Sequence, residues 1–596
     1  MKNCISPLIT ALFLSTIAVA NSAESQTGIG SVATDYSKLK PMMTAFINNK
    51  MSNQNIPGLA IAVIDDQRII WSQAFGLADG ENKINMDINT QFRAGSITKV
   101  FTAIAILQLV EQGKLDLDKS LKTYLPQFKI NSRHGNTDNI TIRSVLSHTS
   151  GLPSDYVMGM WQDSIQTSET PYTELVDLIH SEYVSYPPYT AFSYSNVGLT
   201  LLGHVVHNVS GMSYQNYVRQ NILHPLKMHR SDIEQTISGD NFALSYHPKS
   251  NTPVQELALR DLPAGGLNSV VEDLAHLIMM VNANGEFSGQ QILQENTLHS
   301  MFIKPEMLKL HAPTAHGLGW MVDNSGLVLG KDQIIVGHDG ATIGHTSQLK
   351  VAPKSKLGVV VLGNTSGTGI YGIADFALKQ AYAIKTKQTA TKITNQYINC
   401  SIIDNDNISG SYIVPEIGLA TIKKIRGKWI AEAFDIRMKL KQQTNGLYKF
   451  SYKWLGLFPT DLGELNDIGL CFKQSANKTH ILIYYDGYLT GLAQKVFPRA
   501  ISNAWNKRLG HYQMVETSKF MGATGSSTKI KLSIENGLLI FQNSNTSIKN
   551  VLLPINDQRA IVAGYGRSLG ETIRVQINAG QEELISSGIK LIKSTN

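Results

Sequence analysis

The sequence changes character near residue 386, and this change constrains the fold more than any other feature. Between residues 36 and 385, helical and extended patterns alternate. After a polar Lys/Thr/Gln stretch at residues 386–394, strand patterns predominate to the C-terminus. We therefore expect a large domain that mixes helices and strands, then a linker, then an all-β region.

Composition narrows the class of protein. The chain has 596 residues, 42% of them apolar, which is enough for large cores. Its net charge of +7 is spread without a basic run, so we expect no nucleic-acid partner. Three cysteines without a Cys-x-x-Cys pair exclude a disulfide scaffold. Cys400 and Cys471 would be the two cysteines of the exported chain, and both a disulfide and two free thiols remain open.

Residues 1–23 are typical of an export signal. Lys2 precedes an apolar run at residues 5–19, and the small residues Ala20 and Ala23 offer cleavage positions. The run is shorter than the ~20 apolar residues that span a bilayer, so we favour cleavage over the alternative, a retained anchor. We therefore expect a periplasmic or secreted protein with no stable membrane span after signal cleavage.

Short patterns predict the elements of the first part. An Asp65-Asp66 turn between two apolar runs predicts a β-hairpin. Ser269 and Glu272 have the spacing of a capping box, which predicts the start of a helix. We expect helices at residues 42–51, 101–112 and 372–384, and strands at residues 59–64, 69–75, 348–351 and 357–362.

The C-terminal part contains an approximate repeat. The segments 410–412 and 510–512 both have the pattern Gly-x-Tyr, and each is followed by strand, turn and strand patterns. Residues 530–534 alternate and lead through Asn536-Gly537, a hairpin turn, into another strand. Because closure removes exposed sheet edges, we predict two small antiparallel barrels. Chance similarity between β sequences is the alternative.

Ser96 and Lys99 form the first pattern that carries chemistry. Their spacing places both side chains on one helical face, and the backbone N–H groups of a first helical turn can bind a developing oxyanion. A lysine whose pKa is lowered by burial and by the helix N-terminus can take the serine proton. The chain contains six Ser-x-x-Lys matches, but only Ser96 opens an apolar helix after a turn of small residues.

Tyr194 and Asn196 form a second pattern. A tyrosine between cationic groups can serve as general base or acid, and we expect those cations to favour its phenolate form. Asn196 can donate a hydrogen bond to a substrate carbonyl. The alternative is a structural tyrosine in a loop, since Tyr-x-Asn also occurs at Tyr214 and Tyr397.

The third pattern is His338-x-Gly340, which is the single His-x-Gly of the sequence. Glycines on a strand let the backbone approach a ligand closely. The N–H of Ala341 could then supply a second oxyanion donor beside that of Ser96. The alternative is a structural histidine.

In this order, the three motifs resemble those of the penicillin-recognising serine hydrolases, a family that includes class C β-lactamases, D-alanyl-D-alanine carboxypeptidases, esterases and D-aminopeptidases. The similarity extends to residues 142–153, 264–267 and 317–320, and it covers about residues 36–385. His148 lies in the first of these stretches, where we expect it to make a structural hydrogen bond.

The resemblance implies an α+β fold. Its catalytic domain would be β-lactamase-like, with an antiparallel sheet flanked by helices and an added helical subdomain. Two small antiparallel, lipocalin-like β-barrels would follow, as in the D-aminopeptidases of the family. The expected bounds are 1–23 for the signal peptide, 30–386 for the serine hydrolase domain, 387–400 for the linker, and 401–500 and 501–596 for the barrels.

The resemblance also implies roles for individual residues. Ser96 would be the acylated nucleophile, and Lys99 and Tyr194 would transfer protons. The substrate would be bound by Asn196, His338, Gly340 and Ala341. No cofactor is implied, and the histidine pairs lack the spacing of a metal site, so we expect no metal.

One departure from the family pattern bears on the substrate. Many members that bind β-lactams have Lys-Thr-Gly or Lys-Ser-Gly in the third motif, where the cation holds a carboxylate. His338 is mostly neutral near pH 7, so we expect weaker carboxylate binding by that strand and less efficient penicillin hydrolysis.

We therefore expect an exported serine hydrolase that acts on a small amide, ester or peptide. The alternatives are a D-aminopeptidase, a carboxylesterase, a D-alanyl-D-alanine carboxypeptidase, a β-lactamase proper and a non-catalytic ligand-binding or sensor relative. The sequence leaves the oligomeric state open.

Overall fold

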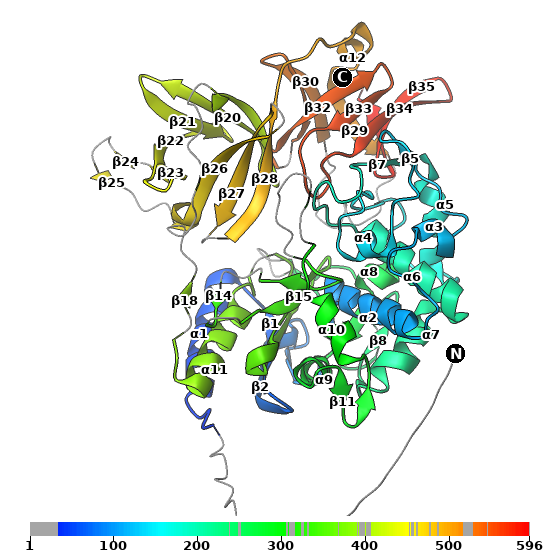
Figure 1. The fold of residues 1–596 in the computed structure, drawn as a ribbon, viewed down its shortest axis with the longest axis vertical. Coiled ribbons are helices and arrows are strands. Elements are labelled where there is room, and N and C mark those ends of the chain that lie inside the picture. The colour runs from blue at the N-terminus through cyan, green and yellow to red at the C-terminus, as the bar shows by residue number, and fades with distance from the viewer. Residues whose placement is uncertain are drawn as a thin grey trace, which may run out of the picture. The chain divides into compact units, whose positions relative to one another are not determined.

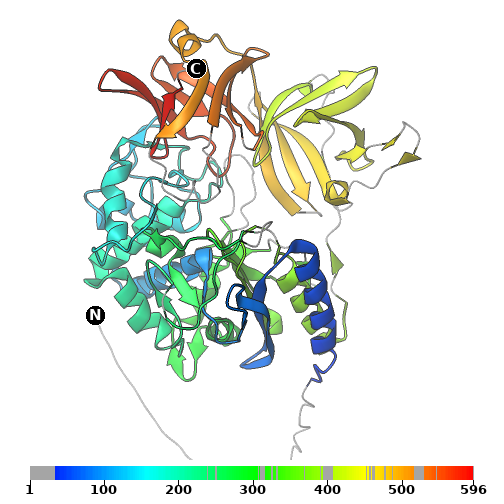
Figure 2. The ribbon, with the colours of Figure 1, turned by 180° about the vertical axis from the view of Figure 1, so that it is seen from behind.

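A computed structural model describes residues 34–594 of the chain, and Figures 1 and 2 show its ribbon from two sides. The expected signal peptide therefore lies outside the described residues. Among the helices described, none is both long enough and apolar enough to cross a membrane. The description omits residues 238, 248–251, 306–307, 309–315, 324–326, 331–332, 368, 390, 393–399, 401–406, 452, 455–457, 460–462, 476–477, 486–487, 516–528 and 545.

A seven-stranded antiparallel sheet organises the first part of the chain, with the strand order β13-β15-β16-β17-β1-β2-β3. The expected hairpin is the β1–β2 pair, and the two late strands predicted from the sequence are β16 and β17. The strands are β1 (Gly58–Asp65), β2 (Arg68–Asp79), β3 (Ile84–Asn85), β13 (Met321–Val322), β15 (Val336–Ala341), β16 (Thr346–Ala352) and β17 (Leu357–Gly363).

Helices cover both faces of this sheet, which explains why every residue of β1 is buried. Side chains alternate between the faces of a strand. Leu59 and Ile61 pack with α1 (Leu39–Gln54) and α11 (Ile373–Thr386), whereas Ala60 and Ala62 face the core that holds α2 (Thr98–Glu111) and α9 (Val271–Asn282). All three predicted helices are confirmed as α1, α2 and α11.

The predicted capping box at the start of α9 is wrong. The helix begins at Val271, and its N-cap Val270 makes no side-chain hydrogen bond. Ser269 instead ends strand β10 (Leu267–Ser269), which pairs with β4 (Phe92–Arg93) and β8 (Asp232–Ile233). The sheet pairing therefore takes priority over the local capping pattern.

A helical subdomain packs beside the sheet, and α6 (Asn196–Ser210) is its longest helix after the second motif. The Ser195 hydroxyl accepts a hydrogen bond from the N–H of Gly198, which caps the start of α6. Gly211 ends it in the left-handed conformation. The remaining helices of the first part are α3 (Leu121–Tyr124), α4 (Ile142–Leu146), α5 (Leu175–Leu178), α7 (Tyr214–Val218), α8 (Leu262–Gly265) and α10 (Glu295–Met301). Helix α12 (Asn503–Lys507) follows the first barrel in the chain.

Short strand pairs complete the first part. One of them places β18 inside the segment expected to be a linker, where it pairs with β14. The pairs are β5 (Asn131–Ser132) with β7 (Tyr183–Val184), β6 (Trp161–Gln162) with β9 (Ala258–Leu259), β11 (Glu286–Phe287) with β12 (Gln290–Gln291), and β14 (Leu327–Val328) with β18 (Thr391–Lys392).

The C-terminal strands form two closed, eight-stranded antiparallel barrels, which confirms the predicted fold. The β19–β20 pair closes the first ring and the β32–β33 pair closes the second. The first barrel contains β19 (Gly410–Val414), β20 (Gly418–Ile425), β21 (Lys428–Ala433), β22 (Ile436–Gln442), β23 (Tyr448–Ser451), β26 (Ile468–Ser475), β27 (Lys478–Tyr485) and β28 (Tyr488–Val496). The second contains β29 (Gly510–Val515), β30 (Lys529–Glu535), β31 (Leu538–Asn543), β32 (Lys549–Asn556), β33 (Arg559–Val562), β34 (Thr572–Asn578), β35 (Gln581–Ser586) and β36 (Ile589–Lys593). A small hairpin, β24 (Lys453–Trp454) and β25 (Phe458–Pro459), follows β23.

The Gly-x-Tyr repeat has the same structure in both barrels. The Tyr412 hydroxyl donates to the carbonyl of Ile408 over 2.7 Å, and the Tyr512 hydroxyl donates to the carbonyl of Arg508 over 2.6 Å. Each bond spans four residues and ties the first strand of a barrel to the segment before it. The sequence repeat therefore reflects a structural repeat.

Cys400 and Cys471 form a disulfide, with their Cα atoms 5.8 Å apart. Cys471 lies on β26, and both residues pack in a small apolar cluster with Leu447, Leu482 and Leu492. The bond links the segment that enters the first barrel to a strand in its wall, so the open question is answered in favour of pairing.

Candidate active site

Ser96 and Lys99 lie together at the start of α2. Ser96 belongs to the 3-10 turn Gly95–Ile97 that precedes the helix, and Lys99 is fully buried in its first turn. The Lys99 Nζ lies 2.9 Å from the Ser96 Oγ and donates to the carbonyl of Ala264 over 2.6 Å. Burial, followed by the nearby charge of Arg567, holds the pKa of Lys99 well below its usual range. Its neutral amine is therefore easier to reach than that of an exposed lysine.

Tyr194 is the second group bonded to Ser96, because the two side chains share a hydrogen bond. Its ring lies 4.9 Å from the Lys99 Nζ and 5.5 Å from the Arg567 Cζ. Burial raises the pKa of Tyr194 well above its usual value, and the bond to Ser96 and the Arg567 charge offset this only in part. The expectation of a phenolate is therefore wrong, because burial penalises the charged form more than the cations favour it.

His148 packs against the ring of Tyr194. The two rings stack with their centroids 4.3 Å apart, and the His148 Nδ1 accepts a hydrogen bond of 3.0 Å from the N–H of Ser195. Burial holds the pKa of His148 well below its usual range, so the ring is neutral and can accept that bond. The expected structural hydrogen bond of His148 is confirmed.

Asn196 begins α6 and lines the cleft beside Tyr194. Its side-chain amide donates to Asp155 Oδ1 over 2.6 Å, and Asp155 Oδ2 accepts a hydrogen bond of 3.0 Å from Arg567. Asp155 therefore fixes the orientation of both Asn196 and Arg567.

The third motif brings the β15 backbone against the serine turn. A Cβ on Gly340 would collide with the carbonyl of Ala94, and one on Gly95, whose φ is +55°, would lie 2.9 Å from the Ala341 nitrogen. Glycine at both positions is what permits this approach. The N–H groups of Ser96 and Ala341 thus lie on two backbone segments in contact, as an oxyanion-binding pair requires.

His338 is only 2% exposed and is not among the residues that line the cleft. Its ring faces His316 and Tyr194 at centroid distances of 5.9 and 6.2 Å, and its Nδ1 lies 2.6 Å from its neighbour's carbonyl, that of Asp339. Burial, with the charges of His316 and Lys99, holds the pKa of His338 well below its usual range. A neutral ring in this position supports the tyrosine side of the site rather than offering a cation to the substrate.

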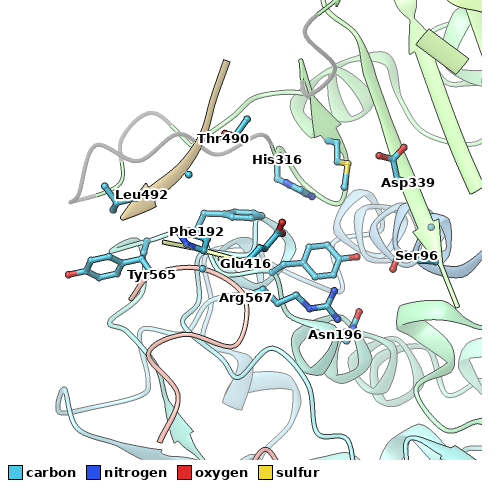
Figure 3. Close-up of a pocket in the computed structure, with 18 of the residues that line it drawn as sticks. Ser96, Phe192, Asn196, His316, Asp339, Glu416, Thr490, Leu492, Tyr565 and Arg567 are labelled. Carbon is cyan, nitrogen blue, oxygen red and sulfur yellow. The ribbon is translucent and has the colours of Figure 1, made fainter. Parts of the chain in front are cut away.

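The cleft above these groups encloses about 490 Å³ (Figure 3). Of the residues predicted from the sequence, Ser96, Tyr194, Asn196, Gly340 and Ala341 line it. Sequence analysis missed the lining residues that come from elsewhere, among them Phe192, His316, Glu416, Thr490, Leu492, Tyr565 and Arg567. Within the described part of the chain, no group of three or more His, Cys, Asp or Glu side chains is arranged to hold a metal ion.

Arg567 reaches the cleft on the loop at residues 563–571, which joins β33 to β34 of the second barrel. The Ser193 hydroxyl donates to the Gly566 carbonyl over 3.1 Å, and the N–H of Ser568 donates to the Ser154 hydroxyl over 2.8 Å. These hydrogen bonds attach the residues immediately before and after Arg567 to the helical subdomain. The only sequence signal for this loop was its glycine-rich composition.

The β-lactamase family model matches residues 43–383. This is more than half of the chain, and the chain belongs to the β-lactamase family. Membership supports a serine-hydrolase-type activity.

The chain is also similar to other known proteins. Protein flp of Staphylococcus aureus (strain NCTC 8325 / PS 47) is 28% identical over 356 residues, which cover 59% of this chain and 68% of that protein. The octameric penicillin-binding protein homologue from Pyrococcus abyssi has a TM-score of 0.51 at 23% identity and covers 76% of this chain and 100% of its own. SurE, solved with D-Leu, has a TM-score of 0.53 at 20% identity and covers 77% of this chain and 100% of its own. These two structures share the fold.

Proposed function

We propose that this protein is an exported serine hydrolase that cleaves small amides or esters through an acyl-enzyme on Ser96. The observation that carries the proposal is the pair of contacts at the Ser96 hydroxyl, with the buried Lys99 amine 2.9 Å away on one side and the Tyr194 phenol on the other. A hydroxyl becomes a nucleophile when a neighbouring base takes its proton, and a lysine with a lowered pKa is such a base.

Acylation uses the protonation states that the site favours. The neutral amine of Lys99 takes the proton as the Ser96 Oγ bonds to the carbonyl carbon, and the N–H groups of Ser96 and Ala341 bind the oxyanion. The Tyr194 phenol then gives its proton to the leaving nitrogen or oxygen. The Lys99 ammonium returns its proton to Tyr194, so both groups regain their starting states.

Deacylation repeats this sequence with water as the nucleophile. Lys99 takes a proton from the attacking water, and the bond between Ser96 and the acyl carbon breaks as Tyr194 protonates the serine oxygen. The products are the free acid and the regenerated Ser96.

A panel of substrates tests the activity and decides between the members of the class. It contains a chromogenic cephalosporin, p-nitrophenyl esters, D-alanine p-nitroanilide and a D-Ala-D-Ala peptide. We expect Ser96→Ala to lower kcat by roughly 10⁴-fold or more on every compound that is turned over. Ser37→Ala is the matched control, because Ser37 starts the same Ser-x-x-Lys spacing at an exposed position.

Labelling tests the covalent step. A fluorophosphonate should add mass to the peptide that contains Ser96 in the wild type and in Ser37→Ala, but not in Ser96→Ala. Equal turnover by wild type and Ser96→Ala, or an adduct on another residue, would place the nucleophile elsewhere.

Export and the expected domain bounds are part of the proposal. The disulfide between Cys400 and Cys471 supports an oxidising compartment. Cleavage after Ala20 or Ala23 predicts a mature N-terminus that N-terminal sequencing of the protein from the native cell will identify. Limited proteolysis should cut first within residues 387–400 if this segment links the domains.

A further inference from the structure

We propose that Arg567 binds a carboxylate of the substrate, so that the second barrel supplies a specificity residue to the active site. The substrates would be amides or esters that carry a carboxylate on the acyl group or on the leaving group. This inference rests on the proposed function and adds a substrate class to it.

The position of Arg567 is the first argument. Its Cζ lies 5.5 Å from the ring of Tyr194, whose hydroxyl is bonded to Ser96. It lines the same cleft as Ser96 (Figure 3), and its side chain is 55% exposed. A group held by Arg567 would therefore lie within one small molecule of the nucleophile.

Free hydrogen-bonding capacity is the second argument. A guanidinium has five N–H donors in a planar fork that matches a carboxylate. The one Arg567 nitrogen that bonds to Asp155, at 3.0 Å, fixes the direction of the fork. The other N–H donors of the half-exposed Arg567 face the cleft. A second carboxylate can therefore bind without breaking the pair of Arg567 with Asp155.

The charge balance near the reacting groups is the third argument. Asp339 and Glu416 line the cleft, and Asp155 is bonded to Arg567. The charge of Arg567 nevertheless affects the pKa of both Lys99 and Tyr194 more strongly than that of Asp155. Asp155 therefore cancels the positive charge of Arg567 only in part beside these two groups.

The third motif gives the fourth argument. Its strand, β15, contains no lysine or arginine, and His338 is buried with a lowered pKa. This strand therefore offers no cation to a carboxylate. Arg567 supplies one from a loop of the second barrel that lines the cleft.

Matched ester pairs test the proposal. Phenyl and 3-carboxyphenyl acetate differ by a carboxylate on the leaving group, and the p-nitrophenyl esters of hexanoic acid and of adipic acid differ by one on the acyl group. In the wild type, we expect kcat/KM to be about 10- to 100-fold higher for the carboxylate ester of at least one pair, as for a hydrogen bond to a charged group. Arg567→Gln should remove this preference, and Arg567→Lys should keep part of it.

The quantity to compare is the ratio of kcat/KM for the two esters of a pair. Arg567 also affects Lys99, so the loss of Arg567 changes kcat for both esters. Arg559→Gln is the matched control. Arg559 belongs to the same barrel and donates to the Tyr183 hydroxyl, away from the cleft. It should leave the ratio at its wild-type value.

The outcomes separate this inference from the proposed function. Three outcomes overturn the role of Arg567 while hydrolysis by Ser96 stands. They are a wild-type ratio of the two kcat/KM values near one, a ratio that Arg567→Gln leaves unchanged, and a preference for cationic esters, which Glu416 would give. Calorimetry with Ser96→Ala needs no turnover. If that variant binds 3-carboxyphenyl acetate no more tightly than phenyl acetate, and monomethyl adipate no more tightly than methyl hexanoate, the inference fails even if no ester is hydrolysed.

Discussion

The imidazole of His148 stacks on the phenol of Tyr194, with 4.3 Å between the ring centroids. His148 is itself fixed by the N–H of Ser195, the residue next to Tyr194 in the chain. The backbone next to Tyr194 thus fixes His148, and His148 in turn packs against the ring of Tyr194. The phenol therefore has little freedom to move away from Ser96.

His148→Ala should therefore impair chemistry more than binding. Loss of the stacked ring lets Tyr194 shift, and a displacement of about 1 Å in a reacting group costs on the order of 100-fold in rate. We expect kcat to fall by about 10- to 100-fold with a small change in KM. The matched control is His204→Ala, a buried histidine of α6 outside the cleft, which should keep the wild-type kcat. A rise in KM at constant kcat would contradict the role of His148.

The pH profile should depend on Arg567. Lys99 must be neutral to accept a proton, so activity falls as pH drops through the lowered pKa of Lys99. The charge of Arg567 helps to lower that pKa, so Arg567→Gln should move the acidic limb of kcat/KM to higher pH. Tyr194 must be protonated, and the same charge lowers its pKa, so the basic limb should also move to higher pH.

These profiles are best measured on a neutral ester, because a carboxylate ester would add a binding effect. Arg559→Gln should reproduce the wild-type limbs. An acidic limb that stays in place, or moves to lower pH, in Arg567→Gln would show that Lys99 is not the base.

Reduction of the disulfide should destabilise the first barrel. Cys400 and Cys471 are separated by 71 residues, and a cross-link over such a loop stabilises by about 4 kcal/mol in the chain-entropy relation. We expect reductant to lower the thermal midpoint of the wild type and to leave the double variant Cys400→Ser/Cys471→Ser unchanged. Coinciding melting curves of wild type with and without reductant would argue against a stabilising bond.

Gly570 should be needed to seat the loop that carries Arg567. A Cβ there would collide with the ring of Tyr186, and its φ of +75° disfavours other residues. Gly580 is the matched control, because its φ is +82° but no atom lies within 4 Å of its Cβ position.

Both alanine variants should pay about 1–2 kcal/mol for the left-handed backbone. Gly570→Ala should lose a further ~1–3 kcal/mol through the collision and should raise KM. Thermal melts and ester kinetics measure the two effects. Equal loss of stability and equal KM in the two variants would show that the contact with Tyr186 does not seat the loop.

Local patterns predicted the parts of this protein whose geometry is local. The spacing of Ser96 and Lys99, the β1–β2 hairpin and the Gly-x-Tyr repeat each lie within a few residues, and the structure places these elements as expected. The protonation state of Tyr194 was predicted wrongly because it depends on burial by distant segments.

Arg567 escaped prediction for a related reason. Its partner Asp155 is 412 residues away, and no periodicity links a barrel loop to the cleft of another domain. A glycine-rich stretch between two strands is common in β proteins, so the composition of the loop did not single it out.

The same separation sets an order of events during synthesis. At roughly 5–20 residues per second, a ribosome needs about 20–80 s after making Asp155 to reach Arg567. For most of that time, once Tyr194 has also been made, the nascent chain contains Ser96, Lys99 and Tyr194 but lacks the wall that Arg567 completes. A newly made chain therefore contains Ser96, the proposed nucleophile, well before it contains Arg567, the proposed specificity residue.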